Sequence, residues 1–158
     1  RIFFVALIGA NFFNTSDCDT AGQDQGCGGG FPTGAYQYVQ SAGGIDAYAN
    51  YPYTAGGGSA SSCSFPQGSV VTSVSNYNSI SGESGEYSQL SSNSGGPVSI
   101  CVDASSWQNY QGGVLTSCSN NVDHCVQLTG YYNYGSSNAY WNVRNSWGAD
   151  WGQNGYIW

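Results

Sequence analysis

Residues 143 to 156 read Val-Arg-Asn-Ser-Trp-Gly-Ala-Asp-Trp-Gly-Gln-Asn-Gly-Tyr, and this stretch decides how the rest of the chain is interpreted. Asn145 is followed closely by two Trp-Gly pairs, Trp147-Gly148 and Trp151-Gly152. Two indoles beside one carboxamide indicate an Asn that is shielded from water, and a buried amide needs fixed hydrogen-bond partners. Gly residues let the backbone turn sharply and pass close beneath the rings. The only histidine in the chain, His124, is therefore the candidate partner of the Asn145 side chain.

A histidine that is held by an Asn forms half of a nucleophilic catalytic site. The amide fixes the tautomer and the orientation of the imidazole, and the second ring nitrogen is left to serve a nucleophile. His124 lies in the sequence Asp123-His124-Cys125, within a stretch that predicts a strand. A lone histidine is more often structural than catalytic, so its assignment depends on the motifs that accompany it.

Several motifs that follow one another along the chain resemble those of papain-family, cathepsin-like cysteine peptidases. They are Asp17-Cys18-Asp19, Gly26-Cys27-Gly28-Gly29, Tyr51-Pro52-Tyr53, Asp123-His124 and Asn145-Ser146-Trp147-Gly148, the last continuing through Trp151-Gly152 to Asn154-Gly155-Tyr156. An ordered set of motifs is more specific than any one of them. The family's nucleophile segment, a Gln followed by Cys-Gly-Ser-Cys-Trp, does not occur in these 158 residues.

The resemblance implies a single α+β, papain-like domain of two lobes, with the active cleft between them and both ends incomplete. We expect a helical lobe over residues 1–66 and a β-barrel-like lobe over residues 67–158. The residues agree with this division. They favour a short helix over residues 33–40, with Thr33 as candidate N-cap and Gly43-Gly44 as its stop. Strands are predicted around residues 70–74, 97–104, 122–131 and 139–146, with a weak helix over residues 82–90 and a helical turn over residues 105–110.

Residues 1 to 13 are apolar on every side and too short to span a bilayer, for which about 20 residues are needed. We interpret them as a buried central helix. The alternative is the core of a signal peptide, with Arg1 as its charged flank.

The resemblance also assigns roles to individual residues. The catalytic set is His124, Asn145 and Trp147, in which Asn145 orients His124 and Trp147 shields their contact. The substrate-binding candidates are Gly29, Gly30, Phe31, Cys101, Ala104, Asp123 and Cys125. The expected substrate is a peptide or protein, cleaved by a Cys, His and Asn mechanism without a cofactor.

Because the nucleophile is absent, we expect this polypeptide, taken literally, to be inactive; removing a nucleophile typically costs about 10⁶-fold in rate. The alternative is a non-catalytic papain-like homologue that serves as a secreted structural, self-assembling or binding protein. A glycan-binding β domain is a third interpretation, which no motif in the sequence supports.

Six cysteines allow fifteen pairings, so the resemblance is needed to choose among them. It pairs Cys18 with Cys63. It places the partner of Cys27 ahead of residue 1 and the partner of Cys118 beyond residue 158, which suggests a truncated domain. The alternatives are an intermolecular link, such as a separate N-terminal segment or a second copy joined through Cys27, or a Cys27–Cys118 pair.

Cys101 and Cys125 are additional to the family's pattern. They lie on two predicted strands that would be neighbours at the base of the substrate pocket, and our hypothesis is a disulfide between them. Neither is a good nucleophile, because Cys125 adjoins His124 in a strand and their side chains point to opposite faces. The cysteine spacings do not suit a zinc site either, so no metal is expected.

The composition narrows the function further. Only 7% of the residues are charged, there is no Lys, and the net charge is −7. Nucleic-acid affinity comes largely from clustered Lys and Arg, so we expect no nucleic-acid partner and, equally, no membrane partner. The cysteines and a glycosylation sequon at Asn14 favour a secreted protein or one of an acidic, lysosome-like compartment.

Overall fold

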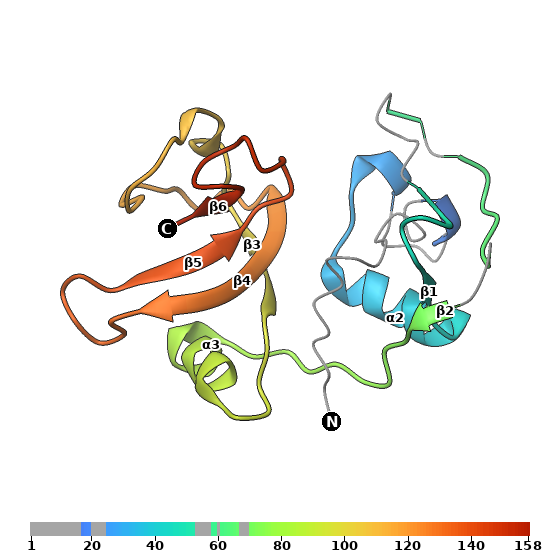
Figure 1. Cartoon of the computed structure of the whole chain (residues 1–158), viewed down its shortest axis with the longest axis horizontal. Coiled ribbons are helices and arrows are strands. Elements are labelled where there is room, and N and C mark those ends of the chain that lie inside the picture. The colour runs from blue at the N-terminus through green and yellow to red at the C-terminus, as the bar shows by residue number, and fades with distance from the viewer. Residues whose placement is uncertain (1–16, 20–24, 53–57, 60, 67–69) are drawn as a thin grey trace. The chain divides into compact units, whose positions relative to one another are not determined.

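The computed structural model describes residues 17–19, 25–52, 58–59, 61–66 and 70–158 (Figure 1). The chain divides into two compact units, residues 1–79 and residues 80–158, and each is described by itself. The helix predicted over residues 1 to 13 and the sequon at Asn14 lie outside the described residues. Among the described helices, none is both long enough and apolar enough to cross a membrane.

Within its described residues, the named elements of the first unit are a 3-10 turn, η1 (Gly26–Gly28), helix α2 (Pro32–Ala42), and the short antiparallel strands β1 (Ile45–Asp46) and β2 (Val70–Thr72). Helix α2 confirms the predicted helix, but the expected N-cap is wrong. Phe31 occupies the cap position and Pro32 follows in the first turn, where its fixed φ suits the helix and its missing N–H costs nothing. Gly43 ends the helix with a φ of 81°, as expected of a glycine stop.

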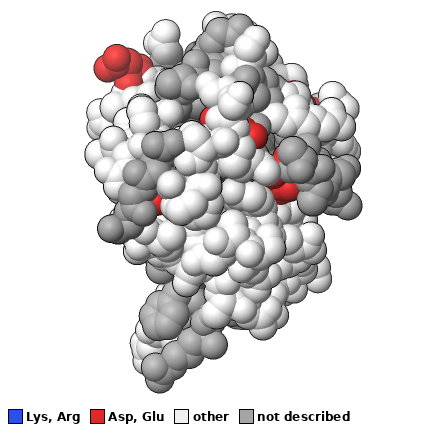
Figure 2. Space-filling model, turned by 90° about the vertical axis from the view of Figure 1, so that its right-hand side faces the viewer, with Lys and Arg blue, Asp and Glu red and all other residues white. Residues whose placement is uncertain are grey.

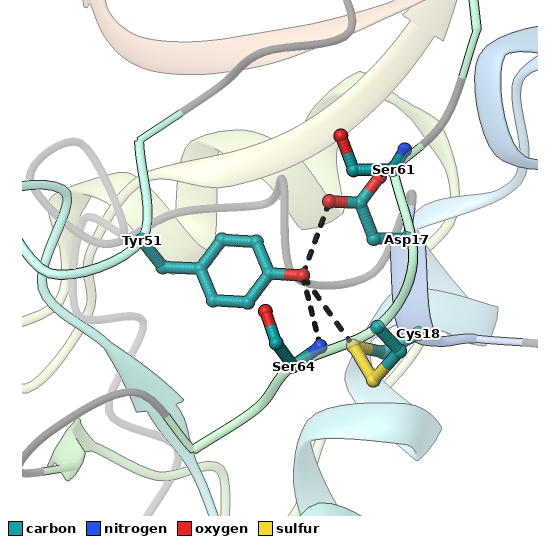
Figure 3. Close-up of a disulfide and its surroundings, with 6 residues drawn as sticks. Asp17, Cys18, Tyr51, Ser61 and Ser64 are labelled. Carbon is teal, nitrogen blue, oxygen red and sulfur yellow. Dashed lines mark hydrogen bonds between the residues drawn. A yellow bond between two sulfur atoms is a disulfide. The ribbon is translucent and has the colours of Figure 1, made fainter.

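A disulfide between Cys18 and Cys63 anchors the first unit (Figure 3). The hydroxyl of Tyr51, which is buried, donates a hydrogen bond to the carboxylate of Asp17 at 3.1 Å. The same hydroxyl accepts the Ser64 N–H at 3.4 Å. These contacts connect the chain on both sides of the disulfide, so the motifs around Cys18 and Tyr51 form one local structure.

The second unit is built on a four-stranded antiparallel sheet in the order β3-β4-β5-β6 (Figure 1). The strands are β3 (Val98–Val102), β4 (His124–Tyr132), β5 (Tyr140–Arg144) and β6 (Tyr156–Ile157); helix α3 (Gly82–Ser91) and the 3-10 turn η3 (Trp107–Asn109) complete the unit. In the register, Val102 lies opposite His124, and Leu128 lies opposite Val143.

The core of this unit is apolar and lies on one face of the sheet. It is formed by Val98, Ala104, Trp107, Tyr110, Val126, Leu128, Val143 and Ile157. Val126 and Leu128 alternate with half-buried Cys125 and Gln127 along β4, as the period of two in a strand requires. His124 shares the face of Val126 by the same period, so the histidine stands where the core meets the end of the strand.

The two units divide between Ser79 and Ile80, later in the chain than the boundary expected from the sequence. The physical reason is strand pairing: β2 is hydrogen-bonded to β1 and therefore belongs with the first unit. The face shown in Figure 2 is mostly uncharged, with a few acidic side chains, as the low content of charged residues predicts.

Candidate active site

His124 and Asn145 meet at one end of the sheet. His124 is the first residue of β4, and Asn145 directly follows β5, which pairs with β4 in antiparallel register. The His124 Nε2 atom lies 2.8 Å from the Asn145 Oδ1 atom. Asn145 is only 8% exposed, whereas His124 is half-buried. The amide is therefore inside the protein and the imidazole reaches from it toward the surface.

The hydrogen bonds around Asn145 determine which imidazole nitrogen carries the proton. The backbone N–H of Ser146 donates to the Asn145 Oδ1 atom at 2.8 Å, which identifies that atom as the amide oxygen. Since a carbonyl oxygen can only accept, His124 Nε2 must be the donor and carry a hydrogen. In the neutral ring, Nδ1 is then the basic nitrogen and is available to a partner on its other side.

Aromatic rings surround this pair. The Trp147 ring stacks on the imidazole of His124, with centroids 5.2 Å apart and an interplanar angle of 27°. Trp107 meets the same imidazole edge-on at 6.2 Å. Trp151 packs against both tryptophans and donates its Nε1–H to the carbonyl oxygen of Trp107 at 3.2 Å. Trp147 is itself 40% exposed, and its role in shielding the His124–Asn145 contact stays a prediction.

Trp107 is the residue that sequence reasoning missed. It is 5% exposed and belongs to the core, yet it lies in a short 3-10 turn that carries no periodic pattern. Its one local signal is a large aromatic residue between polar neighbours, which does not reveal what it contacts.

Two aspartates shape the backbone beside His124. The Asp123 carboxylate accepts the N–H of Ala104 at 2.8 Å, and the Asp123 N–H donates to the Val102 carbonyl at 3.0 Å. Asp103 accepts hydrogen bonds from the hydroxyls of Ser105 and Ser119, which with two backbone N–H groups hold its pKa well below the ordinary range. Asp103 therefore stays ionised and fixes the loop between β3 and β4.

The predicted substrate-binding residues fall in both units. Gly29, Gly30 and Phe31 belong to the first unit, where Phe31 is 60% exposed and Gly29 has a φ of 97°. Ala104 belongs to the second unit and is 6% exposed, packed with the core. Their part in substrate binding stays a prediction.

Cys101 and Cys125 form a disulfide between paired positions of β3 and β4, as hypothesised. Among the cysteines whose side chains the structure describes, Cys118 is the one outside a disulfide, and it is exposed. No group of three or more His, Cys, Asp or Glu side chains suited to a metal ion occurs within the described residues.

The fold and the His124–Asn145 geometry place this chain among the papain-like proteins, and comparison with known families agrees. Residues 13–158 match the model of the papain family cysteine proteases, so the chain belongs to this family. The predicted family and the papain-like α+β fold are thereby confirmed.

Individual relatives are cysteine proteases. Cysteine proteinase 1 of Zea mays is 38% identical over 153 residues, which cover 89% of this chain and 40% of the relative. Germination-specific cysteine protease 1 of Arabidopsis thaliana is 40% identical over 146 residues, covering 89% and 37%. The structure of the bromelain protease from Ananas comosus, in complex with the E64 inhibitor, superposes with a TM-score of 0.80 at 30% identity and covers 94% of this chain and 66% of that one. The chain thus spans about two fifths of the length of these curated relatives.

Proposed function

We propose that this domain contributes the histidine and asparagine of a cysteine peptidase site that hydrolyses peptide bonds. One observation carries the proposal: the 2.8 Å contact between His124 Nε2 and Asn145 Oδ1. That contact leaves Nδ1 as the basic nitrogen. The proposal is also supported by membership of the papain family, since the relatives named above are proteases.

In this mechanism His124 Nδ1 takes the proton of a thiol nucleophile, and the resulting imidazolium later protonates the leaving amine. Asn145 keeps the ring in one tautomer and one orientation through both transfers. Trp147 covers one side of the imidazole, which strengthens the Asn145 contact by excluding water. The substrate is a peptide or protein.

Among the described side chains, the partners of the His124 ring are Asn145, Trp107 and Trp147, so the exposed free thiol of Cys118 is not seated against the imidazole. The other described cysteines cannot supply the nucleophile either. Cys18, Cys63, Cys101 and Cys125 are joined in disulfides. A disulfide sulfur has no thiolate to offer, so none of these four can attack a carbonyl. We infer that the 158-residue polypeptide by itself does not turn over peptides and that a segment with the family's Cys-Gly-Ser-Cys-Trp motif completes the site.

A gain-of-function experiment tests this proposal. The family's nucleophile segment is fused ahead of Arg1, and cleavage of a fluorogenic peptide is measured with and without a thiol-directed inhibitor. We expect inhibitor-sensitive turnover in the fusion and none in the 158-residue polypeptide. His124→Ala in the fusion should abolish the turnover, and a fusion with Ser in place of the added Cys serves as control. Turnover that survives His124→Ala would refute the proposed role.

Self-association is the second candidate function, and exposed aromatic side chains favour it. Tyr132 is 50% exposed and stacks on Tyr140, which in turn stacks on Trp158, itself 37% exposed. A neutral aromatic surface favours packing between identical subunits. Light scattering over a range of concentrations tests the idea, and a monomer at every concentration would exclude it. A covalent partner joined through Cys27 would instead appear as a mass released on reduction.

We also propose that the protein follows the secretory route, to the outside of the cell or to an acidic, lysosome-like compartment. Two disulfides within the described residues support this, because such bonds persist in oxidising compartments. Fractionation of the source cells, followed by intact-mass measurement without reductant, tests it. A fully reduced protein in the cytosol would contradict it.

A further inference from the structure

A covalent bond holds the backbone immediately beside His124. The disulfide joins Cys101 and Cys125, which are directly paired across β3 and β4 with a Cα–Cα distance of 4.0 Å. The next pair in the register is Val102 with His124. The resemblance that assigned the other cysteines does not account for this pair, and the bond joins two strands directly at the candidate site.

The residue on the other side of His124 is held by hydrogen bonds alone. Asp123 donates its N–H to the Val102 carbonyl at 3.0 Å and accepts the Ala104 N–H at 2.8 Å. The backbone around His124 is thus fixed on both sides, by the disulfide to β3 after it and, before it, by hydrogen bonds to the last residue of β3 and to Ala104 beyond that strand.

This fixation matters because of where His124 lies. It is the terminal residue of β4, and β3 is an edge strand of the sheet. The ends of edge elements open at low free-energy cost. The Nε2–Oδ1 hydrogen bond tolerates only a few tenths of an ångström before it weakens. A cross-link one residue from the imidazole therefore acts where the strand would otherwise fray.

We propose that the Cys101–Cys125 disulfide is a redox-sensitive positioning element that keeps His124 against Asn145. The inference rests on the proposed function, since His124 needs this position to serve a nucleophile. Thiol reductants supply the chemistry: two reductant thiols become one disulfide, and the Cys101–Cys125 bond becomes two thiols. Both cysteines are half-buried residues, and neither belongs to the fully buried core.

The proposal has a consequence for a polypeptide that also carries the nucleophile. A catalytic thiolate requires reducing conditions, whereas the Cys101–Cys125 bond requires oxidising ones. Peptidase activity should then be highest at an intermediate redox potential of the solution and should fall on further reduction. A peptidase without this disulfide would stay active under the more reducing conditions.

The test uses the 158-residue chain, because its single histidine gives one set of imidazole signals. Free thiols are alkylated first, and the protein, labelled with ¹⁵N-histidine, is observed by long-range ¹H–¹⁵N spectra during titration with dithiothreitol. Alkylation of the newly released thiols with a second reagent, followed by peptide mass mapping, reports the state of each disulfide. We expect the ratio of the Nε2–H to the Nδ1–H tautomer to fall at least about twofold when Cys101–Cys125 opens, up to the roughly fivefold of a lost hydrogen bond.

Two double variants separate this disulfide from disulfides in general. Cys101→Ala with Cys125→Ala should reproduce the reduced spectrum, whereas Cys18→Ala with Cys63→Ala, which removes the bond of the first unit, should keep the oxidised one. If the first variant does not fold, the wild-type titration decides.

The outcomes distinguish this inference from the proposed function. An unchanged tautomer ratio in protein whose Cys101–Cys125 bond is open by mass would overturn the positioning role alone. If the oxidised protein already shows no excess of the Nε2–H tautomer, the His124–Asn145 contact is absent and both proposals fail.

Discussion

Replacing Asn145 by Ala is the most direct perturbation of the candidate site. The change removes the acceptor of two donors, His124 Nε2–H and the Ser146 N–H, both at 2.8 Å. A hydrogen bond contributes about 1 kcal/mol net, which corresponds to roughly a fivefold change in an equilibrium constant. Asn145→Ala should therefore lower the ratio of the Nε2–H to the Nδ1–H tautomer about fivefold. Its cost to the free energy of unfolding should be about 1–3 kcal/mol, because two hydrogen bonds of about 0.5–1.5 kcal/mol each are lost.

Long-range ¹H–¹⁵N spectra of ¹⁵N-histidine protein under alkaline conditions measure the tautomers, and denaturant unfolding measures stability. Asn142→Ala is the matched control: this Asn lies on β5 and bonds to Thr129, not to His124. Asn145→Asp keeps an acceptor oxygen and should keep the Nε2–H tautomer. An unchanged tautomer ratio in Asn145→Ala, or an equal change in Asn142→Ala, would refute the reasoning.

Three further predictions concern packing, charge and backbone. Trp107 is 5% exposed, so Trp107→Ala should lower the free energy of unfolding by about 3–5 kcal/mol in denaturant melts; a loss below 1 kcal/mol would contradict its place in the core. Hydrogen bonds to the Asp103 carboxylate, the strongest from the Ser105 hydroxyl, lower its pKa in the folded protein. The ionised carboxylate therefore stabilises the fold at any pH above the ordinary aspartate pKa, and this stabilisation is lost as the pH falls through the lowered pKa of the folded state. In thermal melts at a series of pH values, Asp103→Asn should lose less stability on acidification than the wild type. An identical dependence of melting temperature on pH in the two proteins would contradict this role of Asp103. Gly152 has a φ of 57° and a Cβ there would meet a backbone oxygen at 2.7 Å, so Gly152→Ala should cost at least about 1–2 kcal/mol. Gly130→Ala is the control and should not destabilise, because a Cβ there would make only an ordinary contact with the Asn142 side chain at 3.9 Å.

The family and the order of the elements could be predicted because they depend on short-range signals. Helix α2 ends at a glycine stop, and β3, β4 and β5 follow β-branched or aromatic runs, each within a few residues of the predicted limits. The prediction of Thr33 as N-cap was wrong because two local rules compete at the start of this helix. Both a Thr and a Pro can mark the start of a helix, and in the structure the helix starts at Pro32, which occupies the first turn.

The candidate site was predictable only in part. Asp123-His124 and the segment after Asn145 are motifs, so they could be paired from the sequence by resemblance. The Trp107 contact could not, because it depends on how a loop between two strands packs on the sheet. The same is true of the Asp123–Ala104 hydrogen bond, which joins residues 19 apart.

The sequence by itself determined that this chain has one histidine, an asparagine flanked by tryptophans and few charges, and these features place it in its family because each lies in a contiguous run of residues. The tertiary structure alone decided the tautomer of the neutral ring. Only the fold brings the Ser146 N–H and the imidazole to the same oxygen atom, and only that shared oxygen requires His124 to donate from Nε2 and leaves Nδ1 as the base.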